Sequence, residues 1–288
     1  MQRRTDRMSA PESTNPASSQ FLAAIVNRYW EMWAGVLGLI GSWANLMAEV
    51  LGWIWRSLFQ RRARFGMRAL TVQFVRVGTR SIGIVLLVSG CIGTILALQT
   101  APSLEELGQT DKVANLVAVA VFRELGPLIA AIVMTGFAGA SIAAELGTMK
   151  VGEEIEALEA MALNPVRFLV MPRVIATAIS LVVLAVFSDI CAVFFGGVVG
   201  VLVLDIPYEV YRLNTLTQLR PVDFNTGLLK AAVFGGLLGL IACTNGLRVT
   251  GGAAGVGRAT TSTVVQTTVA IVIADLLFSG LFYSLGLN

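Results

Sequence analysis

The sequence predicts an all-α integral membrane protein, with an interfacial helix near the amino terminus, five transmembrane helices and a short cytoplasmic helix between the second and third of them. Apolar residues make up 56% of the 288 residues and charged residues only 14%, whereas an average soluble domain is about 25% charged. A bilayer core requires about 20 apolar residues per helix. Five stretches satisfy that requirement: residues 81–100, 113–144, 174–204, 227–247 and 264–285.

The amino-terminal part has a different composition. Residues 1–20 carry three arginines among polar residues and lack the apolar core of a cleavable signal peptide, so we expect a disordered cytoplasmic tail. Residues 21–64 contain all five tryptophans, and Glu31, Asn45 and Glu49 interrupt their apolar run. Because tryptophan favours the membrane interface, we expect an amphipathic helix lying in that interface rather than a sixth transmembrane helix.

The charge distribution predicts the orientation in the membrane. Eleven of the 21 basic residues lie within residues 1–80, against four acidic residues in the same stretch. Basic residues that flank a membrane span mark its cytoplasmic side. Five crossings then leave the amino terminus in the cytoplasm and the carboxyl terminus outside, although Arg212 and Arg220 fall in an outer segment and fit this rule poorly.

A charged pair interrupts the second predicted span. Arg123 and Glu124 are followed by Pro127, and a charged side chain at the bilayer centre costs about 2.5–3.5 kcal/mol even on insertion scales. Pro127 also has no amide hydrogen to donate to the carbonyl of Arg123. The two charges could neutralise each other or bind a polar lipid headgroup. The alternative is a structural ion pair that joins two helices.

Other chemistry-bearing residues are sparse. Asp189 and Asp275 are lone acids within apolar stretches, which marks them as structural or functional intramembrane acids. The three cysteines are far apart and histidine is absent, so we expect no disulfide framework, no metal site and no catalytic residue. The chain has no phosphate-binding loop for a nucleotide. We therefore expect no cofactor in this chain, and the basic stretch has no recognisable nucleic-acid-binding module.

The segment between the second and third spans has the pattern of a short amphipathic helix. Val151, Ile155, Leu158 and Ala162 recur at helical spacing on one face, and four acidic residues lie elsewhere on the surface: Glu153, Glu154, Glu156 and Glu159. Such a helix can rest its apolar stripe on the helix bundle and offer its acidic side to another protein. A solvated surface helix with no partner is the alternative.

Several motifs in order resemble the MlaE/YrbE permease family of lipid-transporting ABC systems. The resemblance covers roughly residues 65–288, which we interpret as an MlaE-type permease domain. It is carried by Arg-Glu-Leu-Gly-Pro at 123–127, Ala-Glu-Leu-Gly-Thr-Met-Lys-Val at 144–151, Glu-Ala-Leu-Glu-Ala-Met at 156–161, Asn-Pro-Val-Arg at 164–167, Pro-Arg at 172–173, Asn-Gly at 245–246, Gly-Val-Gly-Arg-Ala-Thr-Thr at 255–261 and Ala-Asp at 274–275.

The resemblance implies a homodimeric permease of the bacterial inner membrane that moves phospholipid or a related lipid. It implies two cytoplasmic ATP-binding subunits, which carry ATP and magnesium, and MCE-domain substrate-binding proteins on the far side of the membrane. A lipid pocket would be bordered by Arg123 and Glu124, with Leu98 and Gln99 nearby. The coupling helix, which contacts the ATPase, would use the charged residues Glu145, Lys150, Glu153, Glu154, Glu156 and Glu159.

Two departures from the family pattern limit what can be transferred. Many relatives carry Gly-Arg where this chain has Gly136-Phe137, and some carry tyrosine at the position of Ala101. Neither the lipid nor the direction of transport follows from these residues. The competing function is an ion-coupled secondary transporter that uses Glu124, Asp189 and Asp275 as proton or cation sites.

Overall fold

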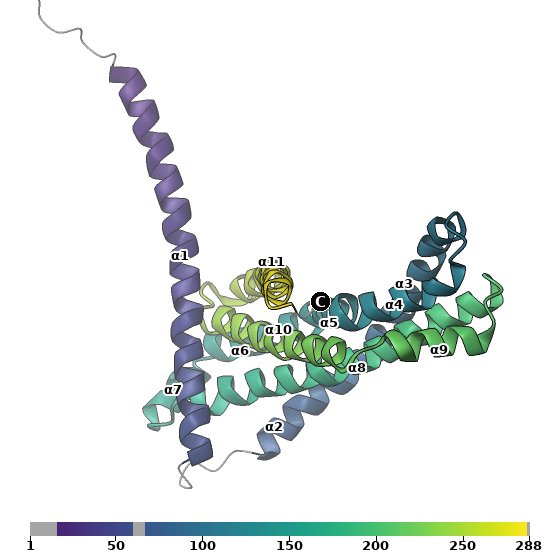
Figure 1. Cartoon of the computed structure of the whole chain (residues 1–288). Helices are drawn as coiled ribbons and strands as arrows, with labels where there is room; N and C mark the ends of the chain where they lie inside the picture. Colours follow the sequence, from purple (N-terminus) through teal and green to yellow (C-terminus); the bar gives the residue numbers. More distant parts are fainter. Residues whose placement is uncertain (1–15, 60–66, 287–288) are drawn as a thin grey trace, which may run out of the picture. The chain divides into compact units, whose positions relative to one another are not determined.

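The computed structural model describes residues 16–59 and 67–286, and all regular structure within them is helical. The prediction of an all-α membrane protein is confirmed. Figure 1 labels the α-helices. Among the described residues, one three-residue 3₁₀ segment and several five-residue π segments connect α-helices. The elements are α1 (Pro16–Phe59), α2 (Met67–Phe74), η1 (Val75–Thr79), α3 (Arg80–Glu105), η2 (Thr110–Lys112), α4 (Val113–Ala120), η3 (Val121–Leu125), α5 (Gly126–Met134), η4 (Thr135–Gly139), α6 (Ala140–Val151), α7 (Glu154–Ala160), η5 (Val166–Val170), α8 (Met171–Leu202), α9 (Tyr208–Gln218), α10 (Pro221–Leu247) and α11 (Gly252–Ser284).

The chain divides into two units, Met1–Asn45 and Leu46–Asn288. In the first unit, α1 begins at Pro16, inside the stretch in which we expected a disordered tail; residues 1–15 of that tail lie outside the described residues. Trp30 and Trp33 are exposed on this helix. The stretch Trp33–Arg56 is long and apolar enough to cross a membrane. Its location in the membrane interface therefore stays a prediction, as does the end of that region at residues 60–64, which are not described.

Five further helical stretches of the second unit are long and apolar enough to span a membrane, and each contains or closely matches one predicted span. They are 68–105, 110–151, 166–202, 221–247 and 252–284. The helices extend beyond the apolar runs because residues of more polar sequence continue them at their ends. The third ends at Leu202, two residues before the predicted limit.

The second span is a composite of α4, η3, α5, η4 and α6. The π segment η3 ends just before Pro127, and the N–H of Gly126 bonds to the carbonyl of Val121, five residues back. Because Pro127 has no N–H to donate, a local change of hydrogen-bond register accommodates it without breaking the helix. Such π turns are frequent at functional sites, and this one carries Arg123 and Glu124.

The core of the second unit forms where α8 packs against α3, α5 and α10 (Figure 1). Its largest buried side chains include Phe234 and Leu238 from α10 and Leu181 from α8. Gly235 lets these helices approach closely, because a Cβ there would lie 2.6 Å from the carbonyl oxygen of Thr177. Helices in membranes associate through such small residues.

The cytoplasmic segment differs in detail from the expected single amphipathic helix. Gly152 and Glu153 interrupt it, with Glu153 in the left-handed conformation (φ 59°), and α7 ends at Ala160. Ile155 is buried and Leu158 is half-buried, as a helix-packing stripe requires. The inclusion of Val151 and Ala162 in that stripe was wrong. Both are exposed, because one precedes the turn and the other follows the end of the helix.

The packing of α10 on α8 yields a test with a matched control on the same helix. Gly235→Ala should lower the free energy of unfolding, because overpacking against a backbone carbonyl costs about 1–3 kcal/mol. Gly236→Ala should raise the free energy of unfolding, since a Cβ there has no neighbour within 4 Å and alanine is favoured over glycine in a helix by roughly 0.5–1 kcal/mol. Thermal unfolding of the purified protein in detergent measures both. Equal shifts for the two variants would contradict the close approach.

Candidate functional site

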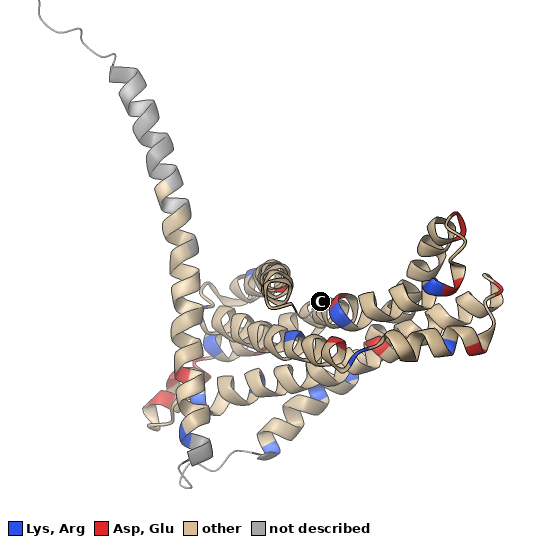
Figure 2. Ribbon diagram, in the orientation of Figure 1, with Lys and Arg blue, Asp and Glu red and all other residues tan. Residues whose placement is uncertain are grey.

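Within the membrane-spanning helices, one buried lysine connects three elements. Figure 2 shows isolated charged residues within otherwise uncharged helices. The Nζ of Lys230 (α10) donates to Glu124 (η3), to Oδ1 of Asp275 (α11) at 2.9 Å and to Oγ of Ser279 (α11) at 3.0 Å. Ser279 Oγ in turn donates to Glu124 Oε1 at 2.9 Å. We call these four residues the lysine cluster.

The lysine cluster is closed on one side and open on another. The Lys230 side chain is 1% exposed, whereas that of Glu124 is 40% exposed. All three ammonium hydrogens of Lys230 have acceptors, which is the full donor capacity of a lysine. With both carboxylates ionised, the cluster carries one net negative charge. Glu124 is therefore the accessible side of the pair, and Lys230 has no donor left for a further acceptor.

Arg123 forms a second pair on the same π turn. Its Nε donates to Oδ1 of Asp223 on α10, while Oδ2 of Asp223 accepts the backbone N–H of Arg220 at 2.9 Å. Asp223 thus caps the first turn of α10 and holds Arg123 at the same time. Arg123 remains partly exposed and Asp223 is buried.

The pairing differs from what the neighbouring positions of Arg123 and Glu124 suggested. The two residues do not neutralise each other; each pairs with a residue about 100 positions later in the chain. Asp275, whose role could not be derived from the sequence, belongs to the lysine cluster. Lys230 was missed by the sequence reasoning. The signal was present, because a lone lysine inside an apolar span needs a partner as much as a lone acid does.

The other predicted intramembrane residues lie outside the lysine cluster. Leu98 and Gln99 are exposed on α3, a helix that contributes no side chain to it. Asp189 is buried on α8, and its Oδ1 has no hydrogen-bond partner among the described residues. Its carboxylate lies directly against Gly126, where a Cβ would overlap with Oδ1. Asp189 therefore packs on the backbone immediately after the π turn and leaves no room for a side chain at position 126.

The cytoplasmic residues that we assigned to coupling fall into two groups. Glu145 lies in the middle of α6 and bridges Arg76 of η1 at 2.8 Å and Arg173 of α8 at 2.9 Å. Lys150 pairs with Glu156, and the hydrogen bond from Lys150 lowers the pKa of the Glu156 carboxyl below its usual value.

Four acids of this segment have exposed side chains: Glu153, Glu154, Glu156 and Glu159. Glu145 therefore links membrane helices, whereas the acids at and near α7 face solvent. Their contact with an ATPase stays a prediction.

Comparison of the sequence with known proteins identifies related permeases. The family model described as Permease MlaE matches residues 70–281. A probable ABC transporter permease protein of Rickettsia prowazekii is 38% identical over 211 residues, covering 73% of this chain and 82% of that protein. A probable ABC transporter permease protein of Synechocystis is 34% identical over 229 residues, covering 77% of this chain and 84% of the relative.

A plant relative is also similar. The chloroplastic protein TRIGALACTOSYLDIACYLGLYCEROL 1 of Arabidopsis thaliana is 35% identical over 211 residues, which cover 73% of this chain and 60% of the relative. Its name refers to a galactolipid. The matched residues of all these comparisons include most of the second unit, in which the lysine cluster lies.

The geometry predicts that Lys230 is essential to stability. Lys230→Met leaves two carboxylates in the membrane without their cation, and breaking a buried pair in this way costs about 3–5 kcal/mol. Lys112→Met is the control, since Lys112 is exposed and surface substitutions usually change stability by less than about 0.5 kcal/mol. The midpoint of thermal unfolding in detergent compares them. A Lys230→Met protein as stable as the control would contradict the pairing.

Proposed function

The chain belongs to the MlaE permease family, and from this premise we propose that it is the membrane-spanning subunit of an ABC transporter that moves phospholipid or a related lipid between membranes. ATP is hydrolysed on a separate subunit, which holds the nucleotide and magnesium, so this chain is not itself an enzyme. The naming of a curated relative after a galactolipid supports a lipid cargo.

The observation that carries the proposal is the lysine cluster within the membrane-spanning helices. A lipid headgroup combines a phosphate with polar or cationic groups, and it must cross a region where isolated charges are costly. Partly exposed Arg123 offers a cation to a phosphate, and Lys230 could do so only if one of its three acceptors moved away. Glu124 and Asp275 offer anions to an amine. Glu124, the most exposed member among the charged residues of the cluster, is the residue that we propose contacts the headgroup first.

The assembly that we propose follows the family. Two copies of this chain form the permease, two ATP-binding subunits bind on the cytoplasmic side, and MCE-domain proteins bind on the other side. The complex is located in a bacterial inner membrane with the amino terminus of this chain in the cytoplasm, as the basic residues of its first 80 positions indicate.

The proposed coupling route starts at the exposed acids at and near α7. Glu153 and Glu154 offer carboxylates to the basic surface of an ATPase. From α7, movement passes through the turn at Gly152 to α6, where Glu145 holds Arg76 and Arg173. This bridge joins three parts of the membrane domain, so a shift of α6 reaches both η1 and α8.

An ion-coupled secondary transporter is the second candidate. Asp189 favours it, because its Oδ1 is buried without a hydrogen-bond partner among the described residues, and the lysine cluster holds two acids for one lysine. Lipid transport that persists with a catalytically inactive ATPase partner would support this alternative. Transport that stops would support the ABC mechanism.

Glu124→Gln tests the role of the lysine cluster in transport. The amide preserves the shape of the side chain and removes the charge, and the loss of one charge-assisted hydrogen bond predicts roughly tenfold slower transport. ATP-dependent transfer of a fluorescent phospholipid from proteoliposomes measures the rate, and Glu105→Gln, at an exposed position, is the control. If the variant fails to co-purify with the ATPase, the cluster has a structural role instead.

Charge reversal at the turn before α7 tests coupling. The double variant Glu153→Lys/Glu154→Lys should weaken co-purification of the ATPase subunit or reduce lipid-stimulated ATP hydrolysis, because it opposes like charges on the two surfaces. The control Glu105→Lys/Glu106→Lys makes the same change in an exposed acidic pair at the end of α3, just before the second span begins. Unchanged ATPase binding and turnover in the first variant would exclude a coupling role for these acids.

A further inference from the structure

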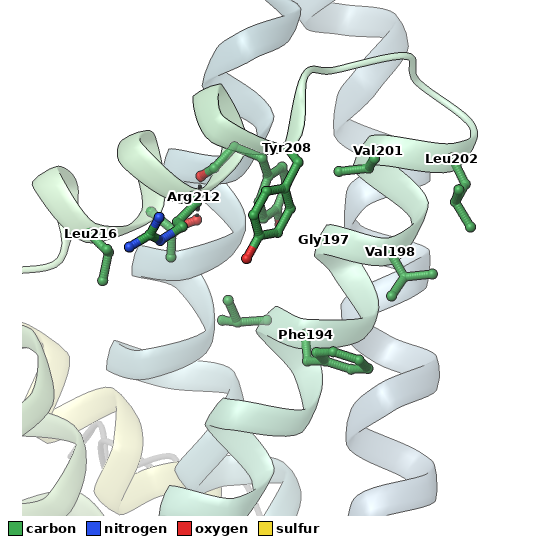
Figure 3. A pocket seen from close by; sticks show the side chains of 11 residues that line it. Phe194, Gly197, Val198, Val201, Leu202, Tyr208, Arg212 and Leu216 are labelled. Atoms are coloured by element: carbon green, nitrogen blue, oxygen red, sulfur yellow. Dashed lines mark hydrogen bonds between the residues drawn. The ribbon is translucent and has the colours of Figure 1, made fainter.

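Two adjoining cavities follow the contact between α8 and α9. The first has a volume of about 540 Å³ and includes Phe194 and Val198 of α8 and Tyr208 and Arg212 of α9 in its lining (Figure 3). The second has a volume of about 550 Å³ and extends to Phe122 of η3. Four residues line both cavities: Val193, Phe194, Thr215 and Leu216. The cavities therefore form one continuous groove, which we call the α8–α9 groove.

Close packing holds the two walls of the groove together. The ring of Tyr211 on α9 lies against Gly197 and Gly200 of α8, where a Cβ would come within 3.0 Å and 2.7 Å of ring atoms. Tyr211 is buried as a result. The distance between the two walls of the groove is thus set by the contact of Tyr211 with the glycines of α8.

The lining of the groove combines an apolar wall with two arginines. Phe194 and Leu216 are 63% and 65% exposed, so its apolar wall faces outward. Arg212 lines the first cavity and Arg220 the second, and both are exposed. Arg212 has a weak contact with exposed Glu209 at 3.4 Å, a kind of surface pair that contributes little.

The arginines lie where the predicted topology does not favour them. Positive residues are preferred on the cytoplasmic side, whereas the segment between α8 and α10 is on the other side. An apolar groove with an exposed arginine in the lining of each cavity matches a lipid, because an acyl chain fills the groove and arginine binds phosphate through paired N–H donors.

We propose that the α8–α9 groove binds a glycerophospholipid of the outer leaflet, with an acyl chain along Phe194 and Leu216 and its phosphate on one of the exposed arginines of the lining, Arg212 or Arg220. This rests on the proposed function and adds an entrance to it. The second cavity is lined by Phe122 and Phe224, whose rings are 6.1 Å apart. Each adjoins one member of the Arg123–Asp223 pair in sequence, so the groove leads from the outer surface toward the π turn.

Photo-crosslinking of the full-length chain tests this site. The protein is purified in a maltoside detergent, which carries no phosphate, and is mixed with a phosphatidylethanolamine probe that has a diazirine on one acyl chain. Diacylglycerol with the same chain is the phosphate-free control. We expect the phospholipid to label peptides of residues 190–202 and 215–224 more than diacylglycerol does. Labelling by the phospholipid should be about threefold to tenfold weaker in the double variant Arg212→Gln/Arg220→Gln, because each exposed pair between an arginine and a phosphate contributes only a small free energy.

Two further variants separate the groove from the rest of the surface. Leu216→Trp fills the shared wall and should reduce labelling, whereas Leu213→Trp changes an equally exposed leucine of α9 that does not line either cavity and should not. Arg248→Gln, an exposed arginine near the end of α10, controls for the loss of positive charge. Monodisperse elution of each variant shows that it is folded.

Three outcomes would overturn the proposal: equal labelling by both probes, unchanged labelling of the double arginine variant, or protection of the groove by a co-purified transmembrane partner that no phospholipid displaces. The transport assay keeps this result distinct from the proposed function. A complex that transfers lipid while its groove stays unlabelled refutes the groove alone. A labelled groove in a complex that transfers no lipid leaves the binding site in place and refutes the function.

Discussion

The burial of one ammonium group inside the helix bundle constrains much of the second unit. Lys230 cannot remain charged in an apolar environment unless acceptors surround it, and Glu124, Asp275 and Ser279 supply them from two other elements. This requirement fixes how η3, α10 and α11 face one another. The close approach of α8 to α10 at Gly235 lies one and a half turns away on the same helix, so electrostatics and packing restrain α10 together.

The backbone of the second span explains how two adjacent charges reach different partners. A regular α-helix places neighbouring side chains about 100° apart, and the π turn Val121–Leu125 adds a local change in that rotation. Arg123 contacts the first turn of α10, and Glu124 contacts a residue two turns further along the same helix. Pro127 makes this turn favourable because its missing N–H has no place in a regular helix.

Composition and periodicity predicted the class of the protein and its five long apolar helices, because the bilayer imposes a length on each span. They also identified Arg123, Glu124 and Asp275, since a charged residue within an apolar run can be recognised from the sequence alone. The partners were not predictable in the same way. Asp223 and Lys230 are about 100 residues from Arg123 and Glu124, to which they bind. Glu145 was grouped with the acids of α7, but it pairs with Arg76 and Arg173.

The turn that separates α6 from α7 has a consequence for force transmission. Glu153 adopts a left-handed conformation that residues other than glycine rarely occupy, and such conformations persist only where the surrounding structure holds them. A glycine at the same position would permit many angles between the two helices. A glutamate restricts that choice, so in the coupling role that we propose α7 would act as a short rigid lever that passes its movement on to α6.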